Sequence, residues 1–220
     1  MDPSPLSPLE ARVLGVLVEK QRSVPDTYPM SLNALVAGCN QKTSRSPIMN
    51  ASEAEVLEAL DALKHRSLVV ETSGGRVMRY AHNAERALGL PSQSVALLAT
   101  LALRGAQTAA ELRSNSDRLH RFADVSAVEA FLHELAERPA GELVAELPRS
   151  LGTRETRWVQ LLSGPPALAA ADTARSDGAA ERSIDIESIA TQLQALREDV
   201  ERLKVAVATL QGDRGIGAPE

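Results

Sequence analysis

The sequence is poor in aromatic residues and in cysteine. Its 220 residues include one Trp, two Tyr and two Phe, so Leu, Val, Ile and Ala must build the core, which favours helices. Cys39 is the only cysteine, which excludes an intrachain disulfide and a zinc site made of several cysteines. No run of about 18 apolar residues occurs, so we expect no transmembrane helix. The N-terminal residues lack the basic and apolar regions of a signal peptide, and we expect a cytoplasmic protein.

The chain also lacks the residue patterns that mark catalytic, metal-binding or phosphate-binding motifs. Its four histidines are scattered along the sequence and form no metal-binding motif (His65, His82, His120, His133). No G-x-S-x-G sequence is present, and Gly74 with Gly75 fits a hairpin turn better than a phosphate-binding loop. We therefore predict a protein that is not an enzyme, with no catalytic residues, no metal and no cofactor.

Residues 7–89 have the pattern of a small helical domain that ends in a β-hairpin. Ser7 opens the first helix with a capping box, and Ser52 opens a third helix in the same way. A short second helix begins at Ser31, and apolar residues recur at helical spacing in all three segments. The segments LVVET and RVMRYAHN then flank a Ser-Gly-Gly turn and predict a hairpin. A helix, a short extended piece, two further helices and a hairpin follow the order of a winged helix-turn-helix domain.

The same pattern recurs in residues 90–163. The segments SVALLATLALRG, QTAAELRSN and AFLHELAER predict three helices, the last of them capped by Ser126, and a longer hairpin follows. A repeat of about 75–80 residues is too long for a solenoid unit. The predicted fold class is therefore mainly α with small β-hairpins (α+β), made of two tandem winged helix-turn-helix domains.

The remaining residues predict a linker and a coiled coil. Residues 164–183 are rich in Ala, Pro, Gly and Ser without a period and indicate a flexible linker. Residues 184–211 carry an unbroken heptad seam: Ile186, Ile189, Leu193, Leu196, Val200, Leu203, Val207 and Leu210. We expect a homodimer through this helix, whereas packing against the chain's own domains or against another protein stays open.

The charge pattern bears on DNA binding in two opposite ways. In winged-helix proteins that bind DNA, the third helix usually enters the major groove. Here the predicted third helices face outward with carboxylates, which oppose binding to a polyanion: Glu53, Glu55, Glu58, Asp61, Glu129, Glu134 and Glu137. Cations gather elsewhere, at Lys42, Arg45, Arg76, Arg79, Arg113, Arg118, Arg121, Arg149, Arg154 and Arg157. These cations either contact phosphates or are solvated surface charges.

Three segments of the chain resemble a known family. They are LEARVLGVLVEK at 9–20, TYPMSLNALVAGCNQKTSRSPIMN at 27–50 and EVLEALDALKHRSLV at 55–69. They are similar to the YceH-like proteins, an uncharacterised bacterial family of tandem winged-helix proteins. The resemblance covers most of the first domain closely and the second more loosely, and it implies the fold without an activity. The family signature falls on Asn40, Gln41, Lys42, Thr43, Arg45 and Pro47, with Ser46 where an aspartate is common.

The signature segment replaces the tight turn of a helix-turn-helix, and two interpretations of it stay open. It is either an internally hydrogen-bonded clasp or a contact surface for DNA or a protein. The candidate contacts are Asn40, Gln41, Lys42, Arg45, Arg76, Arg79, Arg118, Arg121, Arg154 and Arg157. The leading hypothesis is a DNA-binding, transcription-regulating protein with double-stranded DNA as its partner. The alternative is a protein-interaction scaffold that uses its winged helices without binding DNA directly.

Overall fold

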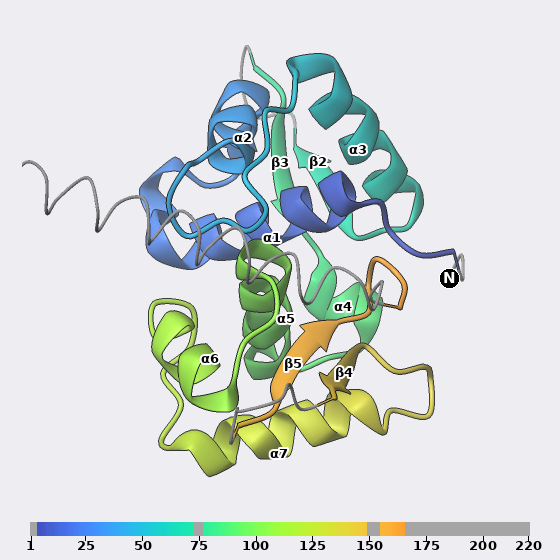
Figure 1. Cartoon of the computed structure of the whole chain (residues 1–220). Coiled ribbons are helices and arrows are strands. Elements are labelled where there is room, and N and C mark those ends of the chain that lie inside the picture. The colour runs from blue at the N-terminus through green and yellow to red at the C-terminus, as the bar shows by residue number, and fades with distance from the viewer. Residues whose placement is uncertain (1–3, 73–76, 149–154, 166–220) are drawn as a thin grey trace, which may run out of the picture. The chain divides into compact units, whose positions relative to one another are not determined.

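The computed structural model describes residues 4–72, 77–148 and 155–165. Within them it contains seven α-helices, a three-stranded antiparallel sheet and a two-stranded one, which confirms the α+β class (Figure 1). The predicted coiled-coil helix with its eight seam residues and most of the predicted linker lie outside the described residues, as do Arg76, Arg149 and Arg154. None of the helices in the described part is both long and apolar enough to span a bilayer.

The first half of the described chain, up to residue 89, contains the three predicted helices and the predicted hairpin. Its elements are α1 (Pro8–Ser23), η1 (Pro25–Thr27), β1 (Met30–Ser31), α2 (Leu32–Cys39), α3 (Glu53–His65), β2 (Val69–Thr72), β3 (Arg79–His82) and α4 (Ala84–Leu88). The sheet has the strand order β1-β3-β2. The sequence predicted a short extended piece between the first two helices but not its position as β1, and it did not predict α4, because two residues of strand and five of helix are too short to show a period.

The predicted capping boxes explain where α1 and α3 begin. The Ser7 hydroxyl accepts from the backbone N–H of Glu10, and the Glu10 carboxylate accepts from the N–H of Ser7. Ser52 and Glu55 make the same reciprocal pair at α3. Each box satisfies two N–H groups that the helix leaves without an internal partner. Both capping boxes are therefore confirmed.

The second half, from residue 90, repeats this order of elements. It contains α5 (Ser92–Arg104), α6 (Ala109–Asn115), α7 (Val125–Ala136), β4 (Val144–Leu147) and β5 (Arg157–Gln160). The predicted cap at Ser126 is wrong, because α7 begins earlier and Asp124 caps it with a side-chain oxygen 2.8 Å from the N–H of Ala127. A carboxylate accepts this bond as well as a hydroxyl does, and its charge also favours the positive end of the helix dipole.

The pairing of the last strand is alike in both halves. In the first, Met30 of β1 lies opposite the buried Tyr80 of β3. In the second, an isolated bridge pairs Gln107 with the buried Trp158 of β5, through N–O distances of 3.0 and 2.7 Å. In each half the residue that pairs stands just before the N-cap of the second helix. The last strand is therefore tied to the second helix in the same way twice.

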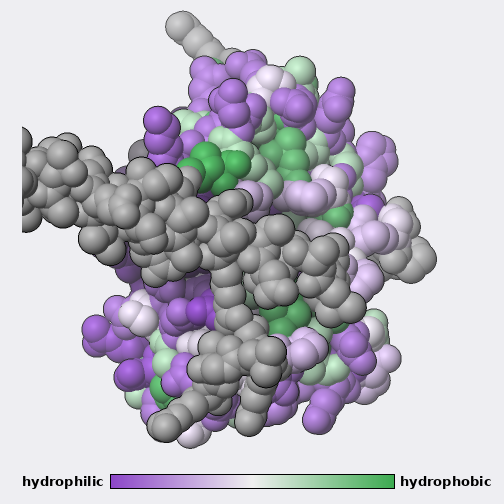
Figure 2. Space-filling model, in the orientation of Figure 1, coloured by the Kyte–Doolittle hydropathy of each residue, from purple (hydrophilic) through white to green (hydrophobic). Residues whose placement is uncertain are grey.

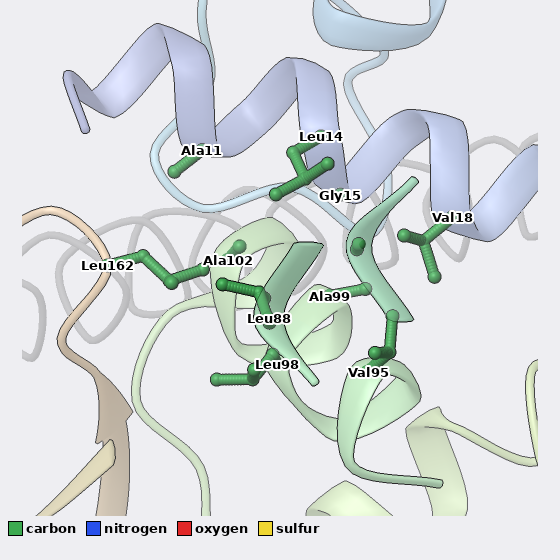
Figure 3. A pocket seen from close by; sticks show the side chains of 11 residues that line it. Ala11, Leu14, Gly15, Val18, Leu88, Val95, Leu98, Ala99, Ala102 and Leu162 are labelled. Carbon is green, nitrogen blue, oxygen red and sulfur yellow. The ribbon is translucent and has the colours of Figure 1, made fainter. Parts of the chain in front are cut away.

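The two halves pack together through α1 and α5 within one compact unit, Met1–Pro166. Figure 1 shows α1 between α5 on one side and α2, α3, β2 and β3 on the other. A side chain at Gly15 would bring its Cβ to 3.0 Å from Leu103, so this glycine allows the close approach of α5. Figure 3 shows Leu14 and Val18 of α1 pointing towards α5. The apolar hollow between them has about 10 Å³ of free space, the room of one water and too little for a metabolite.

Candidate functional site in the loop between α2 and α3

The loop of residues 40–51, which we call the α2–α3 loop, is closed at its base by one side chain. The Asn40 amide donates from Nδ2 to the carbonyl of Ala51 at 2.8 Å and accepts from the N–H of Ala51 at 2.7 Å. One residue therefore joins the end of α2 to the start of α3. Both polar groups of Asn40 are used inside the protein, as the clasp interpretation requires.

Arg45 lies at the centre of the loop and its side chain has no exposed surface. Its Nε donates to the carbonyl of Gly38 at 3.1 Å, and its two terminal nitrogens reach the two carboxylate oxygens of Glu19 at 3.1 and 2.7 Å. Such a paired, charge-assisted contact is the strongest that arginine makes in proteins. Because its donors point inward, Arg45 is not placed to contact an external phosphate.

Arg12 of α1 supports the same loop, although the sequence analysis did not single it out. It is 1% exposed and donates to the carbonyls of Cys39, at 3.2 Å, and Pro47, at 2.7 Å. Burial lowers the pKa of the Arg12 guanidinium, and the positive charge of Arg45 lowers it further. One pattern in the sequence could have indicated this role of Arg12: it stands seven residues before Glu19, on the same face of a helix.

The carboxylate of Glu19 balances the buried charge of the loop. Burial raises the pKa of Glu19, but hydrogen bonds and attraction from Arg45 and Lys20 outweigh this effect, so its pKa lies below the usual value. Lys20 contacts the same carboxylate at 3.0 Å. Nearby, Cys39 is fully buried, and burial raises the pKa of its thiol to about 11. The thiol is therefore neutral at pH 7 and unsuited to nucleophilic chemistry.

The loop also contacts the second half at the end of α5. The backbone N–H of Ser46 donates to the carbonyl of Leu103 at 2.8 Å. Arg104 donates from a terminal nitrogen to the hydroxyl of Ser44 at 2.9 Å. The α2–α3 loop is thus bound to α1, to α2 and to α5, which no pattern in the sequence indicated.

Of the candidate contacts in the described part of the chain, the structure brings four together in the α2–α3 loop: Asn40, Gln41, Lys42 and Arg45. Arg79 lies on β3 and donates to the carbonyl of Pro29 at 2.8 Å. Arg118 and Arg121 follow α6, and Arg121 pairs with Asp117 at 3.3 Å. Arg157 lies on β5 and reaches Glu111 at 3.0 Å and the carbonyl of Ala106 at 2.7 Å. Lys42 and Arg118 are exposed and have no salt-bridge partner in the described part of the chain.

The outward faces of α3 and α7 carry the predicted carboxylates. The exposed stripe of α3 consists of Ala54, Leu57, Glu58, Asp61 and His65, and Leu57 is 40% exposed. On α7 and just after it, the exposed residues include Glu129, His133, Glu134 and Glu137. Across residues 4–72, 77–148 and 155–165, no three His, Cys, Asp or Glu side chains come together as metal ligands would.

Comparison with known proteins places the chain in a family. Residues 6–153 match the model of the family described as "Protein of unknown function, DUF480". The chain is 60% identical over 219 residues to a UPF0502 protein of Cupriavidus taiwanensis, covering 98% of this chain and 90% of that one. It is 57% identical over 199 residues to a UPF0502 protein of Dechloromonas aromatica, covering 90% and 92%. The chain therefore belongs to the DUF480 (UPF0502) family of bacterial proteins, in agreement with its YceH-like signature.

Proposed function

We propose that this protein is a non-enzymatic, tandem winged-helix protein whose third helices bind a protein partner and not DNA. The order of three helices and a hairpin, present in both halves, supports the winged-helix assignment. So does the matching attachment of the last strand, through Met30 and Tyr80 in one half and Gln107 and Trp158 in the other. In this arrangement α3 and α7 are the helices that would meet a partner.

The observation that carries the proposal is the charge on the exposed stripe of α3. Glu58 and Asp61 would lie against phosphates or base edges if α3 entered a major groove, and repulsion from the polyanion would weaken binding. The corresponding face of α7 carries Glu129 and Glu134. A basic protein surface is the partner that these two faces fit electrostatically.

Two of the cations predicted to compensate for these carboxylates are paired with carboxylates of the protein itself. Arg45 is buried against Glu19, and Arg157 pairs with Glu111. These internal contacts remove two of the strongest candidates for phosphate binding. The hypothesis of a DNA-binding regulator therefore loses support relative to the protein-interaction scaffold.

Leu57 supplies the apolar part of the proposed interface. It stands within the exposed stripe of α3, beside Glu58 and one turn from Asp61. Figure 2 shows a face of the molecule on which hydrophilic side chains predominate and hydrophobic ones form small areas. A small apolar centre with a charged rim is typical of non-obligate protein interfaces.

Site-specific photo-crosslinking in cells tests this proposal. A photoreactive amino acid is placed at Leu57, and a matched control carries it at Ala140, which is exposed in the turn after α7. We expect a discrete protein adduct from position 57 that is absent from position 140 and is lost when Glu58→Lys is added. An adduct of equal yield from both positions, or no adduct from position 57, would refute the proposed interface.

A further inference from the structure

We propose that Lys42, Thr43 and Ser44 of the α2–α3 loop, together with Arg104 of α5, form a binding site for a phosphate group. The site lies on the outer edge of the loop, whereas Arg45 and Asn40 hold its inner side. It goes beyond the proposed function, which assigns the partner surface to α3 and α7. Residues 42–44 of the site belong to the first half of the protein, and Arg104 belongs to the second.

The hydroxyl groups of Ser44 and Thr43 can each still donate a hydrogen bond. The Ser44 hydroxyl oxygen accepts from Arg104 at 2.9 Å, and the Thr43 hydroxyl oxygen accepts from the Gln41 amide at 3.2 Å. A hydroxyl that accepts from a neighbouring group still has its own hydrogen to donate. No acceptor for either hydrogen occurs among the described residues, so both hydroxyls are available to an anion.

The backbone of the same edge offers further donors. Within the described part of the chain, the N–H groups of Lys42, Thr43 and Ser44 make no hydrogen bond. Ser44 has a φ of 60°, in the left-handed region, between neighbours that are not helical. Successive free N–H groups around such a residue form the concave arrangement that binds anions elsewhere.

The charges around the site are not balanced internally. Lys42 and Arg104 have no carboxylate within salt-bridge distance in the described part, and the carboxylate of Glu19 is bound by Arg45 and Lys20. Partial burial lowers the pKa of Arg104, and Arg45 lowers it further, while Glu19 acts in the opposite direction. An anion at this point would therefore relieve repulsion between cations as well as accept their hydrogen bonds.

Phosphate is the anion that this set of donors fits best. A planar guanidinium, an ammonium group, two hydroxyls and backbone N–H groups can together bind its several oxygens. A single carboxylate has fewer oxygens to offer to the same donors. Because the proposed function excludes DNA, we expect the phosphate to belong to a free phosphorylated compound, and a DNA duplex is tested below as the other source.

The experiment titrates the full chain with inorganic phosphate and monitors the NMR signals of its backbone amides. A titration with sodium chloride at equal ionic strength is the control. We expect saturable shifts at residues 42–44 and 104 with phosphate only. Arg104→Met, which keeps the apolar stem, should weaken binding about tenfold, since it removes a charged donor. Lys42→Gln, at a fully solvated position, should weaken it several-fold, whereas Arg118→Met should leave it unchanged.

Non-saturating shifts, equal shifts with chloride, or equal affinity in the Lys42→Gln and Arg118→Met variants would overturn the site. A parallel titration with a short DNA duplex identifies the source of the phosphate. Shifts at residues 42–44 with inorganic phosphate but not with the duplex are the expected result and indicate a free phosphorylated compound. Shifts with both would indicate a nucleic-acid backbone and would contradict the exclusion of DNA. Failure to form any adduct from position 57 of the otherwise natural sequence would refute the interface on α3 and leave this site untouched, so the two proposals fail separately.

Discussion

The two halves repeat one order of elements, but different contacts hold the loop between the second and third helices in each half. In the first half, residues 40–51 are held by the buried guanidinium of Arg45 and by the side chain of Asn40. In the second half, residues 116–124 are held by a buried aromatic ring, Phe122, which packs edge-on against Phe131 at a centroid distance of 5.9 Å. An arginine of the second half, Arg113, also reaches the carbonyl of Ala123, but from an exposed position.

This difference indicates that the fold itself does not need the buried ion pair. Burying a charge costs desolvation energy, and an apolar group of similar size usually serves stability as well or better. The second half achieves the same connection with Phe122. The buried ion pair of the first half therefore has a role besides stability. Because Ser44 and Ser46 of the same loop contact the end of α5, we infer that this role is to position the loop for the proposed phosphate site.

The largest expected effect on the free energy of unfolding comes from Phe122, the apolar anchor of the second half. Phe122→Ala removes a ring that is 4% exposed and should lower the free energy of unfolding by about 4 kcal/mol. Urea unfolding followed by circular dichroism measures this change. The partly buried Phe131 provides the matched control, since Phe131→Ala should cost clearly less. An effect of Phe122→Ala below that of Phe131→Ala would contradict the role of Phe122 as the anchor of its loop.

Glu19→Gln tests the buried ion pair that holds the α2–α3 loop. It leaves the side chain of Arg45 buried without its counter-charge, and the free energy of unfolding should fall by about 3 kcal/mol. Glu58→Gln, on the exposed face of α3, is the control and should change it by less than about 0.5 kcal/mol. If Glu19→Gln has as little effect as the control, the ion pair does not hold the loop.

Acidification should affect the first half before the second. Burial lowers the pKa of His82 on β3 to about 4, so this imidazole stays neutral in the folded state while the unfolded chain takes up a proton below about pH 6.5. Its contribution is therefore lost progressively between pH 6.5 and 4. The pKa of Glu19 is lowered, so its contribution is lost as the pH falls below about 4.3. Hydrogen exchange should show protection declining in α3 at a higher pH than in α7, and the reverse order would contradict this assignment.

The smallest expected effect is that of Arg113. Its guanidinium is exposed and bonds to the carbonyls of Phe122 and Ala123 at 3.4 and 3.0 Å. Arg113→Met should lower the free energy of unfolding by about 0.5–1 kcal/mol, since net contributions of exposed hydrogen bonds are small. Urea unfolding of Arg113→Met and of Glu19→Gln side by side compares the two arginine-supported loops directly. A loss for Arg113→Met as large as that for Glu19→Gln would mean that burial of the charge makes no difference.

Local signals in the sequence were sufficient for most of the fold. The capping boxes at Ser7 and Ser52 fixed two helix starts, because the bonds that define them join residues only three apart. The cap of α7 was misplaced, since Asp124 and Ser126 are both good N-cap residues and sequence preference does not separate them. A short extended piece before the second helix was predicted, but β1 could not be placed because its only evidence is its pairing with β3.

The site was harder to predict than the fold because its partners are distant in sequence. Arg45 stands in a polar loop and has the appearance of an exposed cation, and only its contact with Glu19 shows that it is buried. Arg104 gave no signal at all, since its bond to Ser44 joins the two halves. Outward carboxylates on α3 could be predicted, because helical periodicity assigns a face without knowledge of the partner.

The affinity of the full chain for duplex DNA at low and high salt tests the central claim most directly. We predict no binding by the natural sequence at low salt, and a salt-dependent affinity once Glu58→Lys and Asp61→Lys place cations on α3. A control with the same change in charge, Asp26→Lys with Glu142→Lys, should gain much less, since neither residue lies on a third helix. Binding by the natural sequence that falls with salt and is unaltered by the α3 substitutions would contradict the account.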